Sequence, residues 1–157
     1  MVTSQDDLLR RLLAVASRVE SVIDGLSKNE TRTSLAGGWS IAEILAHIRA
    51  SDEILTSHVY MMLVRDNPPI AEFNERRWAE VAGYSHGECH ISLRAFALRR
   101  EELVKTLKAI SAEDWQRKGT HEKRGTITVI GETVYLVDHE EEHCAEMEKI
   151  RAEFTPS

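Results

Sequence analysis

Apolar residues recur every three or four positions in four long stretches of the chain, a spacing typical of amphipathic helices. The first stretch begins after Ser4, which has an acidic residue three positions later, as at a helix N-terminus. Its apolar residues form one stripe along about six helical turns: Leu8, Leu12, Val15, Val19, Val22 and Leu26. We therefore predict a first helix that ends near Gly25, followed by a polar segment at 27–34.

A second helix is predicted over residues 41–65. Ser40 and Glu43 form a Ser-x-x-Glu pattern, in which each side chain can accept a hydrogen bond from the other residue's free backbone N–H. Pro68 and Pro69 follow the apolar run, and a proline disfavours helical geometry in the residue before it. The two prolines therefore mark the end of this helix.

A long connection and a third helix follow. Residues 71–82 could form a short helix within the connection. Ser85 with Glu88 repeats the capping pattern and predicts a third long helix that runs to about Ile110. One further helical turn is expected at 111–114.

The last part of the chain combines a polar segment with a fourth long helix. Residues 118–125 are polar, contain two glycines and are predicted to form a loop. A helical pattern then covers residues 128–154, although the β-branched run at 127–130 also allows a short strand. The four stretches predict an all-α fold, a four-helix bundle with a long connection between helices 2 and 3. We expect one domain over residues 1–157.

Composition and charge exclude several classes of partner. The 157 residues carry a net charge of -6, whereas a nucleic-acid-binding protein needs basic residues gathered on one face. The chain contains no run of about 18 apolar residues, the length needed to span a bilayer. It also contains no basic amphipathic stretch that would suggest binding to a membrane surface. The only cysteines are Cys89 and Cys144, and the first residues contain no apolar leader. We therefore expect a reduced, cytoplasmic setting and no nucleic-acid or membrane partner.

Two histidines of the fourth helix give the strongest indication of chemistry. His139 and His143 are four residues apart and therefore share one helical face. That face also carries apolar residues that should line the bundle interior: Leu136, Met147, Ile150 and Phe154. Buried imidazoles need partners for their nitrogens. These partners could be neighbouring groups or waters, but bundle cores also use this type of spacing for metal ligands.

A third ligand is available on the second helix. His47 lies among apolar residues there, and neighbouring helices of a bundle can bring it to His139 and His143. Three neutral imidazoles suit Zn²⁺, Ni²⁺ or another first-row divalent ion and leave a position open for water or substrate.

Other histidines are weaker candidates. His86 and His90 form a second pair with the same spacing, but at the start of a helix we expect them to be exposed. His58 shares the face of His47 at a distance of about 16 Å along the helix, too far for the same ion. His121 is expected to be exposed in the polar loop.

Two further patterns have simple explanations. His139-Glu140-x-x-His143 matches the zinc-protease motif, yet the downstream ligand is missing, so a peptidase is the least favoured reading. Two Arg-Arg pairs, at 76–77 and 99–100, could meet an anionic substrate, but solvated helix faces are the simpler explanation.

Two signatures together resemble a known family. Gly-Trp-Ser-Ile-Ala-Glu-Ile-Leu-Ala-His, from Gly38 to His47, resembles the helix-two signature of the DinB-like superfamily, and His139-x-x-x-His143 resembles its second signature. The resemblance covers almost the whole chain. It implies a four-helix bundle with a metal ion on His47, His139 and His143, and often a homodimer. Glu140 replaces the frequent Asp after the first histidine of the pair, and a common Gln a few residues later is absent.

Three functional hypotheses follow. Related branches of this superfamily include metal-dependent thiol transferases and isomerases that use a low-molecular-weight thiol such as mycothiol or bacillithiol. The first hypothesis is therefore a metal-dependent enzyme, a thiol transferase or hydrolase, that activates a thiol or water for attack on a small electrophile. Glu146 and Tyr135 are the nearest candidates for a general base. The alternatives are a metal-binding scaffold or stress protein without turnover, and a metal-free bundle that binds a partner helix.

Overall fold

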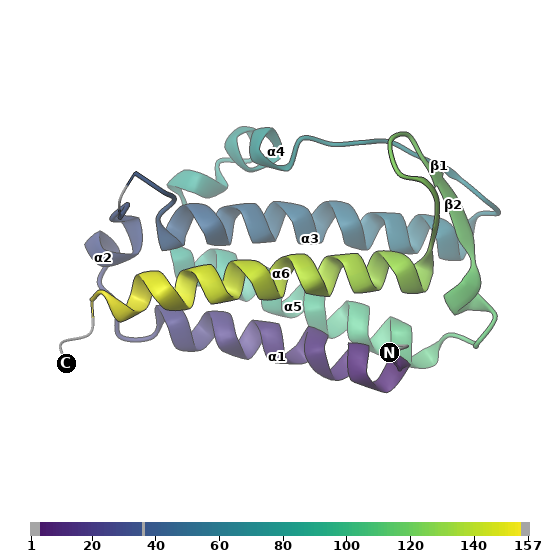
Figure 1. Cartoon of the computed structure of the whole chain (residues 1–157), viewed down its shortest axis with the longest axis horizontal. Helices are drawn as coiled ribbons and strands as arrows, with labels where there is room; N and C mark the ends of the chain where they lie inside the picture. Colours follow the sequence, from purple (N-terminus) through teal and green to yellow (C-terminus); the bar gives the residue numbers. More distant parts are fainter. Residues whose placement is uncertain (1–3, 36, 155–157) are drawn as a thin grey trace.

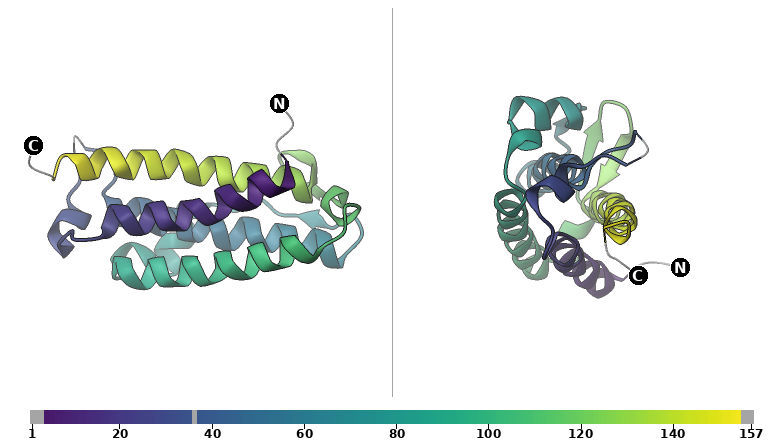
Figure 2. Two further views of the ribbon diagram at one scale, coloured as in Figure 1. Left: turned by 90° about the horizontal axis from the view of Figure 1, so that it is seen from below. Right: turned by 90° about the vertical axis from the view of Figure 1, so that its left-hand side faces the viewer.

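Four long helices lie side by side in the computed structural model, which describes residues 4–35 and 37–154 and, of Ser85, only the backbone (Figure 1). They are α1 (Gln5–Ile23), α3 (Ile41–Val64), α5 (Cys89–Ala109) and α6 (Val129–Ala152). α3 packs against α5 and α6, and α1 packs against the same two helices. The end-on view in Figure 2 shows the four helices around one interior. The predicted four-helix bundle is confirmed.

The interior is built from the apolar stripes of all four helices. On α1, five of the six residues of the predicted stripe are almost completely buried: Leu8, Leu12, Val15, Val19 and Val22. Leu26 lies beyond the end of α1 and packs only partly against this core. Burial of one large aliphatic side chain contributes about 1.5–3 kcal/mol, so these stripes hold the helices together.

Side-chain caps explain where most of the long helices begin. Ser4 Oγ accepts a hydrogen bond from the backbone N–H of Asp7, and Ser40 with Glu43 forms a complete capping box at the start of α3. The start predicted from Ser85 was wrong. Ser85 lies in a short 3₁₀ helix, η1 (Tyr84–His86), and α5 begins at Cys89 with no side-chain cap.

The connection between α3 and α5 is long, as predicted. It contains β1 (Pro69–Ile70), the short helix α4 (Glu75–Val81) and η1. One helix was not predicted. α2 (Lys28–Arg32) forms in the polar segment before α3, because Ser27 and Glu30 make a capping box there.

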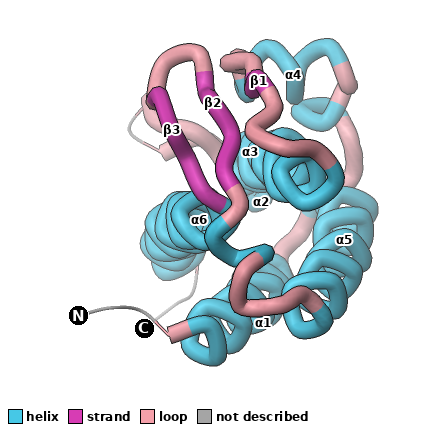
Figure 3. The backbone as a smooth tube through the Cα atoms, turned by 90° about the vertical axis from the view of Figure 1, so that its right-hand side faces the viewer, coloured by secondary structure: helices cyan, strands magenta, loops and turns pink. Residues whose placement is uncertain are grey.

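A small sheet covers one end of the bundle, above α3 and α6 (Figure 3). β2 (Lys118–His121) pairs with β3 (Gly125–Thr128) in antiparallel fashion and with β1 in parallel fashion. The loop predicted for residues 118–125 was therefore wrong at 118–121 and at Gly125, which belong to strands. The strand allowed at 127–130 is present only through Thr128. Gly125, with φ 70°, supplies the left-handed turn that closes the hairpin. Another short helix, η2 (Asp114–Gln116), precedes β2.

Within the described ranges of the chain, none of the helices combines the length and the apolar character needed to cross a membrane.

Candidate metal centre

Three histidine side chains from two helices converge between α3 and α6. His47 comes from α3, and His139 and His143 come from successive turns of α6. One potential ligand nitrogen from each ring lies within 4.8 Å of the other two. Nε2 of His47 is 3.1 Å from Nε2 of His139, and the ring centroids are 4.7 to 5.0 Å apart. The packing of α3 on α6 thus brings together the three residues that the sequence analysis singles out.

The electrostatic surroundings keep two of these rings neutral. Burial, assisted by the charges of His139, His143 and Arg76, lowers the pKa of His47 to about 3. Burial and the charge of His143 lower the pKa of His139 to about 4. At neutral pH both rings are therefore unprotonated imidazoles with a free lone pair. Such convergent nitrogen donors fit a divalent transition-metal ion, for which neutral imidazole is a preferred ligand.

A carboxylate orients the third ring. Oε2 of Glu146 is 3.1 Å from Nδ1 of His143. The carboxylate can accept a hydrogen bond from Nδ1–H, which leaves Nε2 of the same ring with its lone pair. Ligand histidines in metal sites commonly have such an outer carboxylate. Glu146, one of the two candidate bases, is thus occupied with positioning His143.

A second carboxylate reaches the cluster from α4. Oε2 of Glu75 is 3.7 Å from Nε2 of His47. Burial raises the pKa of Glu75 above its ordinary value. The sequence does not reveal this residue, because no local pattern shows where the long connection passes over the bundle.

Aromatic rings flank the cluster on both sides. Trp39 stacks on His143, with centroids 6.2 Å apart, and the guanidinium of Arg76 lies 4.3 Å from the centre of the indole ring. Tyr135, the other candidate base, stacks on His139 at 6.3 Å. These stacks restrict the orientations that the two histidines of α6 can adopt.

Glu140, the acidic residue of the His-Glu-x-x-His pattern, does not face the cluster. Its fully buried carboxylate accepts a hydrogen bond at 2.6 Å from Nη2 of Arg100, which also donates to Asp52 at 2.8 Å. Burial raises the pKa of Glu140 and of Asp52, and the guanidinium opposes that shift. The solvated face predicted for Arg100 was therefore wrong. Because this pairing engages its carboxylate, Glu140 is not available as the base of a zinc protease.

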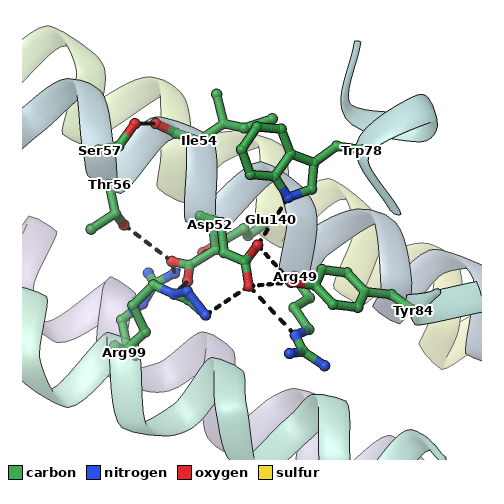
Figure 4. A network of polar contacts seen from close by, with 11 residues as sticks. Arg49, Asp52, Ile54, Thr56, Ser57, Trp78, Tyr84, Arg99 and Glu140 are labelled. Carbon is green, nitrogen blue, oxygen red and sulfur yellow. Dashed lines mark hydrogen bonds and ion pairs between the residues drawn. The ribbon is translucent and has the colours of Figure 1, made fainter. Parts of the chain in front are cut away.

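The same polar network fixes the position of α4 (Figure 4). Glu53 on α3 accepts hydrogen bonds from Trp78 Nε1 at 3.0 Å, from Tyr84 at 2.7 Å and from Arg99 at 2.9 Å. The first two donors belong to α4 and η1, so the network holds the connection over α3. This attachment brings Glu75 to the histidine cluster.

The other histidines lie apart from the cluster. His86 and His90 are exposed, as expected. The expected exposure of His121 was wrong, since its ring is buried beneath the hairpin. Its Nδ1 accepts hydrogen bonds from the backbone N–H groups of Lys123 and Arg124.

His58 is also buried, and its partner was not predicted. Its Nδ1 is 2.7 Å from Oε1 of Glu132. Glu132 precedes His139 by seven residues, or about two helical turns, and therefore lies on the same face of α6. A count along that face would have identified Glu132, so this residue could have been found from the sequence.

Sequence comparison relates the chain to a family and to named proteins. The model of the DinB superfamily matches residues 11–147. A protein of Oceanobacillus iheyensis, OB0413, provisionally named a metal-dependent hydrolase, is 22% identical over 147 residues, which cover 92% of this chain and 84% of the relative. OB0782 of the same organism bears the same provisional name and is 26% identical over 110 residues, which cover 69% of this chain and 63% of the relative.

Two solved structures share the fold. YfiT from Bacillus subtilis, described provisionally as a metal-dependent hydrolase with an unusual four-helix bundle topology, superposes with a TM-score of 0.89 at 17% identity, over 100% of this chain and 91% of YfiT. The mycothiol-dependent maleylpyruvate isomerase superposes with a TM-score of 0.74 at 14% identity, over 92% of this chain and 60% of the isomerase. The family match over most of the chain and the bundle of the same topology lead to one conclusion: this chain belongs to the DinB superfamily.

Proposed function

We propose that His47, His139 and His143 bind one divalent transition-metal ion, zinc or nickel, and that the protein is a metal-dependent hydrolase of a small molecule. The convergence of three imidazole nitrogens within 4.8 Å of one another is the observation that carries this proposal. The names of the relatives in Oceanobacillus iheyensis support the reaction class.

The residues around the cluster have distinct roles in this proposal. When bound, the ion would supply Lewis-acid chemistry, which polarises a substrate and lowers the pKa of a coordinated nucleophile. Glu146 would hold the ring of His143. Glu75, at 3.7 Å from Nε2 of His47, would accept the proton of the nucleophile. Glu75 takes the role of base because Glu146 is paired with His143, and because burial raises the pKa of Tyr135, whose phenol therefore stays protonated at neutral pH.

An assay of metal-loaded protein tests the role of Glu75. Wild type and Glu75→Gln would be compared on chromogenic esters and amides, with Glu142→Gln, an exposed neighbour of the ligand pair, as the matched control. We expect Glu75→Gln to lower kcat by about 100-fold or more, as for loss of a general base, and to keep its metal. An unchanged kcat in Glu75→Gln would refute the assignment. Absence of turnover in metal-loaded wild type would favour the alternative, a metal-binding scaffold or stress protein.

A thiol transferase is the second candidate. The observation that favours it is the likeness to the mycothiol-dependent isomerase, and the nucleophile would then be a low-molecular-weight thiol such as mycothiol or bacillithiol. The same assay with a generic electrophile, with and without added thiol, distinguishes the two candidates. A rate that requires the thiol supports transfer, and a rate independent of thiol supports hydrolysis.

We further propose that the protein is a homodimer, as the family resemblance implies, and that it is cytoplasmic, in keeping with its two free cysteines. Light scattering at tens of micromolar, a concentration at which a dimer with submicromolar Kd stays assembled, should give twice the 17.8 kDa mass of the chain. A monomer mass at this concentration would contradict the homodimer.

A further inference from the structure

A polar cavity lies next to the histidine cluster, between α3, α6 and the hairpin. Its volume is about 290 Å³. Glu75 and Tyr135 line it at the end where they contact His47 and His139. His58 and His121 line it at the end beneath the hairpin, and Ile54 with Leu55 adds apolar surface. A molecule in this cavity would therefore reach from the candidate metal centre to His58.

At the far end, Glu132 holds His58 in a defined tautomer. Oε1 of Glu132 is 2.7 Å from Nδ1 of His58, and Arg124 donates to both carboxylate oxygens at 2.7 and 2.8 Å. Burial alone would raise the pKa of Glu132, but the hydrogen bonds from His58 and Arg124 outweigh burial and lower it. The ionised carboxylate can only accept hydrogen bonds. Nδ1 of His58 is therefore the donor of this pair.

This tautomer leaves an unused acceptor at the cavity. In the neutral imidazole, a proton on Nδ1 makes Nε2 a lone-pair acceptor. Nε2 of His58 is buried and has no hydrogen-bond partner among the described residues. The ring lines the cavity whereas Glu132, its partner at Nδ1, does not, and from this we infer that the Nε2 edge lies on the cavity side. A buried acceptor without a partner is unfavourable unless a ligand or a water supplies a donor.

The two cations of the cavity are already paired with carboxylates. Lys123 Nζ lies 3.1 Å from Glu72, and Arg124 is paired with Glu132. His121 accepts at Nδ1, so its proton is on Nε2, which is 3.4 Å from Glu72. With both cations paired, the cavity offers an acceptor to a ligand rather than a free positive charge.

We propose that this cavity binds the end of the substrate far from the histidine cluster, and that Nε2 of His58 accepts a hydrogen bond from a hydroxyl or ammonium group of that substrate. This inference rests on the proposed function in one respect: the histidine cluster is taken as the place where the other end of the substrate reacts. His58 is about 16 Å along α3 from His47, so it determines specificity by binding and takes no part in bond cleavage.

An NMR titration of the imidazole ¹⁵N resonances tests the proposal directly. The probes are ethanolamine, choline, tetramethylammonium and propionate. Ethanolamine, choline and tetramethylammonium carry the same positive charge. Ethanolamine has both a hydroxyl and an ammonium donor, choline has only the hydroxyl, and tetramethylammonium has no hydrogen-bond donor. We expect ethanolamine, at up to about 50 mM because so small a ligand binds weakly, to shift the Nε2 resonance of His58 upfield in a saturable manner. Choline will do the same if the hydroxyl is the group that is bound. Tetramethylammonium and propionate should leave the resonance unmoved.

Variants of His58 provide the second readout. In His58→Asn the amide nitrogen can still donate to Glu132 in place of Nδ1, but nothing replaces Nε2. We expect this variant to bind ethanolamine at least fivefold more weakly, whereas the exposed control His90→Asn keeps the wild-type Kd. If His58→Asn does not fold, the comparison of probes on wild type alone decides the matter.

Three results would overturn the proposal: equal shifts with tetramethylammonium, tighter binding of propionate, or an Nε2 resonance that ethanolamine does not move, as a permanently bound water would give. Metal content, measured on the same samples, tests the proposed function separately. A protein with a full equivalent of metal and no ethanolamine binding refutes the cavity alone, and a protein that binds ethanolamine but holds no metal refutes the metal centre alone.

Discussion

Three charged side chains that pair with one another lie in the interior of the bundle, where apolar side chains would be expected. Arg100, Asp52 and Glu140 are completely buried and share one set of hydrogen bonds. Removing one member of such a group leaves the others charged and unpaired in a medium of low dielectric constant, and that change costs more than the pair contributes.

Replacement of Arg100 by methionine tests this group. Arg100→Met retains most of the side-chain volume and leaves Asp52 and Glu140 without their shared partner. We expect the free energy of unfolding to fall by about 3–5 kcal/mol, measured by urea denaturation. The control Arg94→Met removes an exposed guanidinium from the same helix and should change the free energy of unfolding by no more than about 0.5 kcal/mol. Equal effects of the two substitutions would contradict the burial of this charge.

Glu132 provides a prediction of pH dependence. Its pKa in the folded protein is lowered from 4.5, so at acidic pH the unfolded chain binds the proton more readily and stability falls as pH drops. Glu132→Gln should therefore lower the free energy of unfolding by about 2 kcal/mol at pH 7, and the difference from wild type should shrink as pH falls below about 4.5. Urea denaturation of wild type and Glu132→Gln, at pH 7 and at a pH below about 4.5 and with chelator present, measures this difference in the free energy of unfolding. A difference that does not change with pH would show that the charge of Glu132 is not what stabilises the fold.

Among the elements, α3 and α6 hold the candidate site along one shared seam. His47 faces His139 and His143 near the middle of the seam, and His58 faces Glu132 toward the sheet. Helical periodicity was sufficient to predict these two helices and the three-histidine set, because spacing along a helix determines which residues share a face.

Elements outside the helices were harder to predict for a physical reason. β2 has only four residues, and its pairing with β1 joins segments about 50 residues apart, so no local pattern encodes it. The position of Glu75 depends in the same way on hydrogen bonds between α4 and α3. For Arg100, a surface arginine and a buried one look alike in sequence until the packing of α5 on α3 is known.

Gly119 in β2 tests the packing of the sheet on α3. A Cβ atom at this position would lie 2.7 Å from Cδ1 of Ile70 and 3.1 Å from Cγ of Met62. Gly119→Ala should lower the free energy of unfolding by about 1–3 kcal/mol through overpacking.

Ile70→Val removes the crowding methyl group and supplies the matched variant. In the double variant, part of the loss caused by Gly119→Ala should be recovered, which a double-mutant cycle by urea denaturation would detect as a coupling energy above about 0.5 kcal/mol. Strictly additive effects would show that β1 and β2 do not pack as described.

For the whole molecule, the proposed metal ion would join the two halves of the chain, since His47 belongs to one half and His139 and His143 to the other. An ion bound only to the folded state stabilises it by about 3 kcal/mol when free metal is a hundredfold above its Kd. Chelation should then lower the Tm by about 6–12 °C for a chain of this length. Calorimetry on wild type and on His143→Ala measures this, and the variant should show no shift with chelator. An equal shift in both proteins would mean that the stabilising ion is bound elsewhere.

The most direct test of the account is the metal content of protein purified without a histidine tag. Elemental analysis of wild type should give about one equivalent of a divalent transition metal per chain, as expected for a single three-histidine site. His143→Ala should have almost none, and His90→Ala, which alters the exposed histidine pair, should keep the full equivalent. A His143→Ala protein that retains its metal while His90→Ala loses it would contradict the assignment of the metal centre to His47, His139 and His143.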